Sequence, residues 1–291
     1  MKKLIFFAVL ITIAIAARAQ ESILVTAGWL KEHINDPDLV ILQIGYLKLD
    51  YEKEHIAGSQ FLWPGWLAPD SPEGSFNAPD PAAATELLQK MGISGNSRVV
   101  LCHVRNEVSV AARMFLTLED LGLKGRVFWL NGGLDAWKKE GNPVTDKVTV
   151  AKRGNFKAKL ADLLVDKVYV QKAMQASNQV IVDARMQKYY DGSEPTGLPR
   201  DGHIPGARNI PYPDMIDEAN MFKPTAKLQE YFTPVADKDK ELVAYCFIGQ
   251  TASVVYMAGR ILGYKMKLYD GSLQEWTRIA ELPMEVTKKE Q

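Results

Sequence analysis

The sequence predicts an α/β protein of two homologous domains, each an open and mainly parallel sheet flanked by helices. Three observations predict this fold class. The chain has 291 residues, which is room for two domains of ordinary size. Several motifs recur in both halves in the same order, and within each half short apolar runs alternate with amphipathic stretches. A composition of 47% apolar and 24% charged residues is typical of a globular protein.

The internal repeat rests on four pairs of matching motifs. They are VILQIG at 40–45 with VIVDAR at 180–185, HIAG at 55–58 with HIPG at 203–206, VVLCHVRNEVS at 99–109 with LVAYCFIGQTAS at 242–253, and NGGLDAW at 131–137 with DGSLQEW at 270–276. The offset between partners drifts only slightly, as loop insertions would produce. We therefore predict a duplicated domain.

Six apolar runs are predicted to form buried parallel strands, because their apolar residues are continuous rather than alternating. They are VILQI, RVVLC and RVFWL in the first half, and QVIVDA, ELVAYC and KMKLYD in the second. PAAATELLQKMG is predicted to be a helix that begins at Pro81 and ends before Gly92. SVVYMAGRILG repeats apolar residues every three to four positions, which predicts a second helix after residue 253.

The chain begins with the pattern of an export signal. Lys2 and Lys3 precede an apolar run at 4–17, and Ala17-Arg18-Ala19 is a small-x-small cleavage site. A membrane-spanning helix needs about 20 apolar residues, so the alternative of an uncleaved anchor is disfavoured. We expect a signal peptide at 1–19 and an exported protein, periplasmic or extracellular, with no stable membrane insertion after cleavage.

The polar stretch VTDKVTVAKRGNF, at 144–156, separates the two halves. It predicts a first domain at 20–148, a linker at 149–159 and a second domain at 160–291. The chain carries 35 basic and 35 acidic residues, a formal charge of zero. Nothing in this balance indicates a nucleic-acid partner.

One of the two cysteines, Cys246, stands between a predicted strand and a predicted helix. The intervening residues are rich in small side chains, and Gly249 permits a positive φ or a close backbone approach. A loop of this kind can aim backbone N–H groups inward, and the following helix, expected to begin at Ser253, adds its positive end. Such a setting lowers the pKa of a cysteine from its reference value near 8.5. Cys246 is therefore a candidate nucleophile, the alternative being an inert buried thiol.

Several other cysteine chemistries are disfavoured. Export would permit a disulfide between Cys102 and Cys246, but their matching positions in two repeats predict separate loops. A phosphatase loop needs an arginine six residues after its cysteine, where this chain has Ala252 and, in the first copy, Val108. The sequence has no Cys-x-x-Cys motif, and its four histidines lack ligand spacing, so we predict no dithiol chemistry and no metal.

Four motifs of the second half, in order, carry a resemblance to a known family. The motifs are VIVDAR, GHIPGARNIP at 202–211, the cysteine loop and LYDGSLQEW at 268–276. Together they resemble the rhodaneses, in particular the tandem two-domain sulfurtransferases, and the resemblance covers nearly the whole mature chain. The resemblance implies two rhodanese-like domains and a persulfide on Cys246, without any cofactor. A small anionic donor, thiosulfate or 3-mercaptopyruvate, would supply the sulfur, and cyanide or a thiol would accept it.

The resemblance also implies a binding site for the donor. Arg185 ends a predicted strand at the edge where open α/β sheets bind ligands, and its guanidinium suits an anion. The alternative for Arg185 is a structural ion pair with Asp183. Asp183 is predicted to be mainly structural, capping or bonding nearby backbone. His203 is predicted to be a turn and packing residue, because His55 matches it in the first copy. The anion would also be held by the backbone of Phe247, Ile248, Gly249, Gln250, Thr251 and Ala252.

The sequence departs from the family near the cysteine. Phe247 and Ile248 stand where thiosulfate-type members have basic residues, and they are expected to pack at a domain interface or to accept a larger apolar donor. The second arginine of the mercaptopyruvate-type members is also missing. Lys188 or Arg200 is a candidate replacement, although Arg200 reads equally as a solvated loop charge. The donor therefore stays open.

The first copy is predicted to be an inactive domain that covers one side of the site, with an active Cys102 as the alternative. We expect Glu107 to raise the pKa of Cys102 by like-charge repulsion, which Arg105 would partly offset. The replacements are Gln43 for Asp183, Gly45 for Arg185, Arg105 for Gly249 and Val108 for Ala252.

Two further alternatives stay open at this point. FLWPGWL at 61–67 is either a partner patch or packing between the domains. The competing function, from a different class, is a non-catalytic module that binds sulfane sulfur or a small anion on the same fold.

Overall fold

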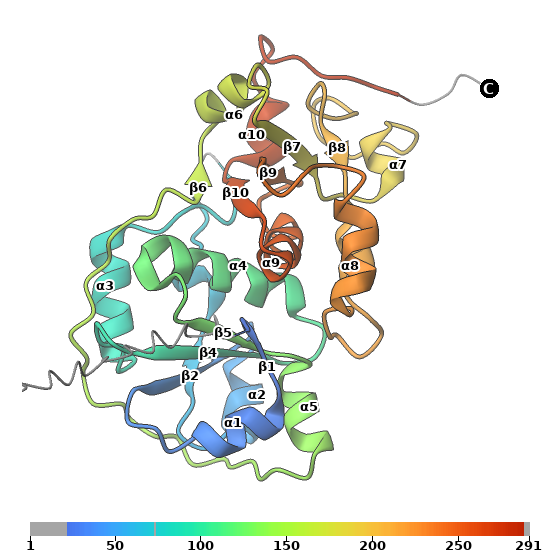
Figure 1. Ribbon diagram of the computed structural model, residues 1–291. Helices are drawn as coiled ribbons and strands as arrows, with labels where there is room; N and C mark the ends of the chain where they lie inside the picture. Colours follow the sequence, from blue (N-terminus) through green and yellow to red (C-terminus); the bar gives the residue numbers. More distant parts are fainter. Residues whose placement is uncertain (1–21, 73, 288–291) are drawn as a thin grey trace, which may run out of the picture.

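The computed structural model describes residues 22–72 and 74–287, so the predicted signal peptide at 1–19 lies outside the described residues. Figure 1 shows two sheets with their own helices, the first built by the blue to green half of the chain and the second by the yellow to red half. Helices α4 and α9 lie side by side between the two sheets. No helix in the described ranges is long and apolar enough to cross a membrane.

The two sheets have the same topology. Each has five strands, and every pair of neighbours is parallel. The first has the order β1-β5-β4-β2-β3, with β1 at Leu24–Val25, β2 at Leu39–Ile44, β3 at Gln60–Leu62, β4 at Arg98–His103 and β5 at Val127–Leu130. The second has the order β6-β10-β9-β7-β8, with β6 at Leu164–Val165, β7 at Gln179–Asp183, β8 at Arg208–Asn209, β9 at Glu241–Tyr245 and β10 at Lys265–Tyr269. The predicted duplication and all six predicted strands are confirmed.

Helices connect the strands of each sheet. The first half contains α1 (Ala27–His33), α2 (Lys48–Lys53), η1 (Pro64–Trp66), α3 (Pro81–Lys90), α4 (Val108–Leu118), η2 (Glu119–Leu123) and α5 (Gly133–Lys139). The second contains α6 (Lys167–Ala173), α7 (Gln187–Tyr190), η3 (Tyr212–Met215), α8 (Thr225–Phe232), α9 (Ala252–Leu262) and α10 (Ser272–Trp276). Helix α3 begins at Pro81 as predicted, and the Asp80 side chain accepts a hydrogen bond from the N–H of Ala83.

Helix α9 begins one residue earlier than predicted. Its first residue is Ala252, and Thr251 precedes it in the N-cap position. Ser253 was the expected start. Its side chain lies inside the first turn instead, where the hydroxyl donates to the carbonyl of Gly249 at 3.1 Å. This contact ties the helix to the cysteine loop.

The hydrophobic core continues from one domain into the other. Every residue of α4 except Ser109 is buried, and so is every residue of α9 except Arg260 and Ile261. A helix that is apolar on almost all sides must be covered on all sides. The two helices cover each other, and their side chains belong to one cluster that reaches both sheets. The domains therefore form one packed unit.

The segment between the domains lies against the first domain. Residues 146–161 form no helix or strand, but Gly154 donates to the carbonyl of Gln89 at 2.8 Å and Phe156 to that of Ile93 at 3.1 Å. A Cβ on Gly154 would lie only 2.0 Å from the Ile93 carbonyl oxygen, so this approach requires glycine. The Phe156 side chain is buried.

The aromatic FLWPGWL segment does not pack between the domains, so that alternative is wrong. Trp63 and Trp66 are 40% and 46% exposed. Their rings meet edge to face at 6.2 Å, and Trp66 meets Phe61 in the same way at 6.1 Å. Phe61 also contacts the ring of buried Tyr51, with the centroids 5.7 Å apart, so all these aromatic contacts lie within the first domain.

Candidate active site

Cys246 directly follows β9, at the carboxyl end of the second sheet. Cys102 is the matching residue in β4. Both are free thiols and both are fully buried, which confirms the prediction of two separate cysteines rather than a disulfide. The N–H of Cys246 donates to the Ser272 hydroxyl at 3.3 Å, so the start of α10 holds the base of the loop.

The carbonyl groups of the cysteine loop are nearly all occupied by donors around it. Leu273 N–H donates to Cys246 O at 3.1 Å, Gln274 N–H to Phe247 O at 2.9 Å, Arg113 Nη1 to Gly249 O at 3.3 Å, Ser253 N–H to Gln250 O at 3.1 Å, and Val254 N–H to Thr251 O at 3.1 Å. The donors come from α10, α9 and, across the domain boundary, from α4. The loop carbonyls are thus turned toward the surrounding elements.

The N–H groups of the same loop are left without protein partners. From Phe247 to Ala252, no backbone N–H donates to another protein group within residues 22–72 and 74–287. The N–H and C=O of a trans peptide point in opposite directions, so turning the carbonyls outward leaves a row of free donors on the other side. Such a row, next to the N-terminus of α9, favours an anion.

Gly249 meets both conditions for which the sequence suggested a glycine. Its φ is +77°, in the left-handed region. A Cβ there would lie 2.9 Å from Arg113 Nη1 and 3.0 Å from the Asp270 carbonyl oxygen. The side chain of the next residue, Gln250, donates to the Ser109 hydroxyl at 2.9 Å. The loop is therefore held by the first domain at two consecutive residues.

Arg185 follows β7 and forms the ion pair with Asp183 that the sequence offered as an alternative. The two side chains are 1% and 0% exposed, with Nη2 and Oδ2 at 2.6 Å. Arg185 Nη2 also donates to the carbonyl of Gly202 at 2.7 Å. Its Nη1 has no hydrogen-bond partner among the described residues. The guanidinium thus keeps one buried donor group free.

The pKa of Arg185 is set mainly by its burial and by Asp183. Burial by itself lowers the pKa of Arg185, but the hydrogen bonds and negative charge of Asp183 raise it above its usual value, and Cys246 acts in the same direction. The Phe247 ring covers the guanidinium, with its centroid 5.1 Å from Cζ, and Tyr189 meets Phe247 edge to face at 5.3 Å. Both of these ring contacts of Phe247 lie within the second domain.

Both candidates for a second cationic anchor are engaged by other groups of the second domain. Lys188 Nζ lies 3.1 Å from Glu194 on the surface. Arg200 is not a solvated loop charge. Its guanidinium donates to four carbonyl groups at and beyond the end of α10, those of Trp276, Thr277, Ile279 and Leu282. These contacts hold it away from an anchoring role.

His203 is a packing residue, as predicted, and its counterpart in the first copy is built in the same way. His203 Nδ1 bonds the carbonyl of Tyr190 at 2.7 Å, and the two rings stack at 3.9 Å. His55 Nδ1 bonds the carbonyl of Tyr51 at 2.6 Å, with stacking at 4.0 Å. Both histidines are buried. The repeat therefore extends to side-chain contacts.

The first-copy loop shares one left-handed residue with the second but differs in its hydrogen bonds, since the N–H of Glu107 donates to the carbonyl of Val104 at 3.1 Å. Arg105 occupies the place of Gly249 with a φ of +48°, also left-handed. Its side chain is exposed and pairs with Asp50 at 2.7 Å. The pKa of Cys102 is well above its usual value, mainly because the thiol is buried and secondarily because of the charge of Asp135. Glu107, which we expected to be the cause, is not among these contributions.

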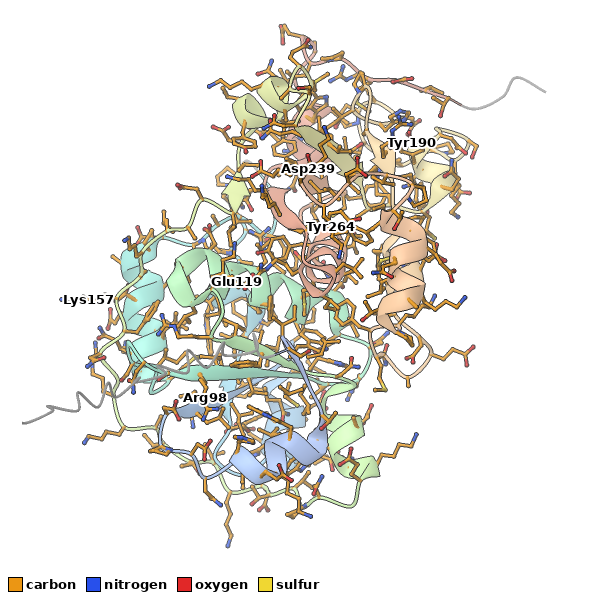
Figure 2. All side chains as sticks on the ribbon, viewed as in Figure 1. Arg98, Glu119, Lys157, Tyr190, Asp239 and Tyr264 are labelled. Atoms are coloured by element: carbon orange, nitrogen blue, oxygen red, sulfur yellow. The ribbon has the colours of Figure 1, made fainter. Side chains whose placement is uncertain are left out.

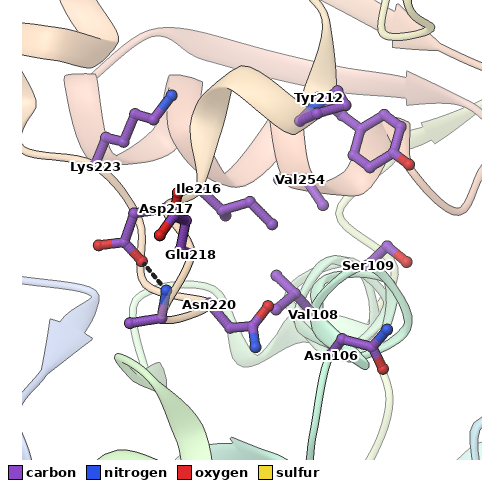
Figure 3. A pocket seen from close by; sticks show the side chains of 12 residues that line it. Asn106, Val108, Ser109, Tyr212, Ile216, Asp217, Glu218, Asn220, Lys223 and Val254 are labelled. Atoms are coloured by element: carbon purple, nitrogen blue, oxygen red, sulfur yellow. Dashed lines mark hydrogen bonds between the residues drawn. The ribbon is translucent and has the colours of Figure 1, made fainter.

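A cavity of about 920 Å³ lies between the domains beside the loop. Figure 3 shows Ser109 and Val108 of α4 on one wall and Tyr212, Val254 and Lys223 of the second domain on the other. Ser109 is the residue that holds Gln250, so the cavity adjoins the loop from the side of the first domain. Cys246 itself is not part of its wall.

Sequence reasoning missed the residues that support the loop. Ser272 and Gln274 lie in DGSLQEW, whose repetition marked the motif but not its role. Gln274 is bound at both ends of its side-chain amide by Ser75 of the first domain, at 2.9 and 2.8 Å. Ser109 and Arg113 gave no signal, because α4 reads as an ordinary core helix. In the described part of the chain, no cluster of three His, Cys, Asp or Glu side chains is placed to hold a metal ion.

Comparison with protein families finds one matching model, the Rhodanese-like domain. It matches twice, at residues 26–140 and 166–279. Each match covers one of the two sheets and its helices, so the family model divides the chain in the same way as the internal repeat does.

Curated relatives match over nearly the full chain. The "Sulfur carrier protein TtuD" of Thermus thermophilus is 31% identical, over 91% of this chain and 97% of its own. A "Probable 3-mercaptopyruvate sulfurtransferase" of Pseudomonas aeruginosa is 32% identical, over 87% and 94%. The "Thiosulfate sulfurtransferase" of Gallus gallus is 29% identical, over 94% and 99%.

Solved structures show the same fold. The anaerobic ergothioneine biosynthesis enzyme from Chlorobium limicola, in complex with trimethyl histidine, superposes with a TM-score of 0.79 at 21% identity. The match covers 91% of this chain and 70% of that one. At this identity the likeness concerns the fold alone.

Proposed function

Because the chain belongs to the rhodanese family, we propose that it is a sulfurtransferase that carries sulfur as a persulfide on Cys246. The observation that carries the proposal is the row of unpaired N–H groups from Phe247 to Ala252 beside this thiol. A thiolate and a persulfide are both anions, so the same donors stabilise the enzyme before and after it takes up sulfur. The curated relatives support it, since two of the three are named sulfurtransferases.

The reaction has two nucleophilic steps. The Cys246 thiolate attacks the sulfane sulfur of thiosulfate, the S–S bond of the donor breaks, and sulfite leaves with its electron pair. With 3-mercaptopyruvate the C–S bond breaks instead, and the carbon takes up a proton to give pyruvate. Cyanide or a thiol then attacks the outer sulfur of the persulfide and restores the thiolate.

Arg185 is the proposed anchor of the donor. Its free Nη1 supplies one charged hydrogen-bond donor. Because Cys246 and Arg185 are both buried while Phe247 and Ile248 are half-buried, we infer that these two side chains move aside when the donor enters. Their apolar character leaves thiosulfate and 3-mercaptopyruvate as competing donors.

The decisive experiment is persulfide turnover by residues 20–291 with thiosulfate and 3-mercaptopyruvate in parallel and cyanide as acceptor. Thiocyanate should form with at least one donor, Cys246→Ser should abolish it, and the matched control Cys102→Ser should leave it unchanged. Equal loss in both variants would overturn the assignment of Cys246 and the proposal of an inactive first domain. Expression of the full chain in the same work tests export, which requires a mature N-terminus at Gln20.

Full burial of Cys246 favours one alternative, a non-catalytic module that binds sulfane sulfur or a small anion. Such a module would bind thiosulfate in a calorimeter but release no sulfite and form no thiocyanate. Binding without turnover for either donor would select this alternative.

A further inference from the structure

Helix α4 of the first domain inserts a buried arginine against the cysteine loop of the second. Arg113 is fully buried, and its Nη2 lies 2.5 Å from Asp270 Oδ1. Its Nη1 donates to the carbonyl of Gly249 at 3.3 Å. The other oxygen of Asp270 accepts from the N–H of Ala78, also in the first domain, at 2.9 Å. A charge as fully buried as this one requires partners, and the loop carbonyl is one of them.

The same face of α4 makes a second contact with the loop. Ser109 lies one helical turn before Arg113, and its hydroxyl accepts from Gln250 Nε2 at 2.9 Å. The peptide that joins Gly249 to Gln250 is therefore bound on one side through its carbonyl and on the other through the Gln250 side chain. Both of these contacts come from the first domain. Within the second domain, the Ser253 hydroxyl donates to the same Gly249 carbonyl at 3.1 Å.

The orientation of this peptide decides what it presents to the sulfur. With its carbonyl directed at Arg113, its N–H points the opposite way and belongs to the row of unpaired donors. A flipped peptide would replace that donor by a carbonyl oxygen, which repels an anion. Glycine allows such a flip more readily than other residues, so a contact that prevents it matters more at Gly249 than elsewhere.

We propose that Arg113 is a positioning residue for sulfur transfer, which fixes the Gly249–Gln250 peptide so that its N–H supports the anionic sulfur of Cys246. This inference rests on the proposed function of the loop. It assigns the first domain a specific contribution, delivered by one guanidinium, beyond covering the site.

The competing explanation is that Arg113 only stabilises the domain interface, and Arg260 provides a matched control for it. Arg260 of α9 forms a buried pair across the same interface, with Nη2 2.8 Å from Glu119 Oε1. It lies eight residues beyond the start of α9, about 12 Å along the helix from the loop. Lysine at either position keeps the charge but cannot form the two-armed contact of arginine.

The test compares Arg113→Lys with Arg260→Lys in a Cys102→Ser background. The rate of Cys246 alkylation by iodoacetamide is measured from pH 5 to pH 10, together with thermal unfolding. We expect Arg113→Lys to move the midpoint of the rate–pH curve up by about one unit and to lower the rate at neutral pH about tenfold, since thiolate formation loses a donor. Arg260→Lys should leave the curve in place, whatever its effect on unfolding.

If Arg113→Lys does not fold, Ser109→Ala takes its place in the test. This variant removes only the hydrogen bond between the Gln250 side chain and the half-buried Ser109 hydroxyl. We expect it to shift the midpoint of the rate–pH curve in the same direction by a smaller amount. Unchanged midpoints in Arg113→Lys, or equal shifts in both lysine variants, would reduce Arg113 to an interface residue. Alkylation does not depend on turnover. If the midpoint of the rate–pH curve shifts only in Arg113→Lys and the native protein forms no thiocyanate, Arg113 positions the loop but the proposed transferase activity is wrong.

Discussion

Arg185 combines a buried ion pair with a free donor group, and the two roles respond differently to substitution. Arg185→Ala would leave Asp183 buried without a counter-charge, a loss of about 3–5 kcal/mol in unfolding free energy that obscures any kinetic effect. Arg185→Lys keeps the charge beside Asp183 but not the planar fork. We expect it to raise the donor KM about tenfold or more while kcat changes less, as measured by initial rates with each donor.

Arg208→Lys is the control for that variant, because Arg208 is an exposed arginine on the neighbouring strand β8. Its substitution should leave both KM and the urea midpoint unchanged. A KM for Arg185→Lys equal to that of the native protein would show that the free Nη1 does not meet the donor.

Single functional residues were predictable where the neighbouring sequence shows their position in the sheet. Cys246 and Arg185 each follow an apolar run, which placed them at the carboxyl edge of the sheet. The contact between the Phe247 ring and the Arg185 guanidinium could not be predicted, because it joins residues that follow two different strands. Arg113 and Gly249 are 136 residues apart, and the sequence around neither residue indicates their contact. Long-range polar contacts of this kind follow from packing and not from periodicity.

At the scale of elements, the end of α10 depends on Arg200. The last carbonyl groups of a helix lack intrahelical donors, and here one guanidinium serves four carbonyls between Trp276 and Leu282. Arg200→Ala should therefore lower the unfolding free energy by about 2–3 kcal/mol in urea titrations, while the donor KM stays unchanged. Arg200→Lys should recover part of the loss.

Lys188→Ala is the comparison for Arg200→Ala, because the Lys188 ammonium makes an exposed ion pair with Glu194 and lies over the Tyr189 ring at the surface. It should leave the urea midpoint where it is. If Arg200→Ala also left the urea midpoint unchanged, the contacts of Arg200 with the four carbonyl groups would contribute nothing to stability. Arg200 would then behave as a solvated loop charge.

Element prediction succeeded for the central strands and failed at the edges of both sheets. Strands β2, β4, β5, β7, β9 and β10 are four to six residues long, and their buried runs are readable as apolar sequence. Strands β1, β3, β6 and β8 have only two or three residues, too few for any period to show. They are strands because a neighbour offers hydrogen bonds to them, which is a property of the assembled sheet.

At the scale of the whole molecule, the duplication was predictable and the docking of the two copies was not. Figure 2 shows Glu119 at the end of α4, on the side that faces the second domain. Glu119 is fully buried, and it accepts from Tyr256 Oη at 2.6 Å and from Arg260 Nε and Nη2 at 3.1 and 2.8 Å. In sequence Glu119 is one acidic residue among many, because its two partners, Tyr256 and Arg260, lie in the other repeat.

The shared core and this buried pair predict that the two domains unfold together. The native protein should show one urea transition by tryptophan fluorescence and by circular dichroism alike. Glu119→Gln removes the counter-charge of the mostly buried Arg260, so the unfolding free energy should fall by about 3–5 kcal/mol. In the double variant with Arg260→Met no unpaired charge remains, and part of the loss should return, giving a coupling energy in the double-mutant cycle. Two separate transitions in the native protein would mean that the domains unfold independently. Additive losses in the cycle would mean that the Glu119–Arg260 pair contributes no coupling energy.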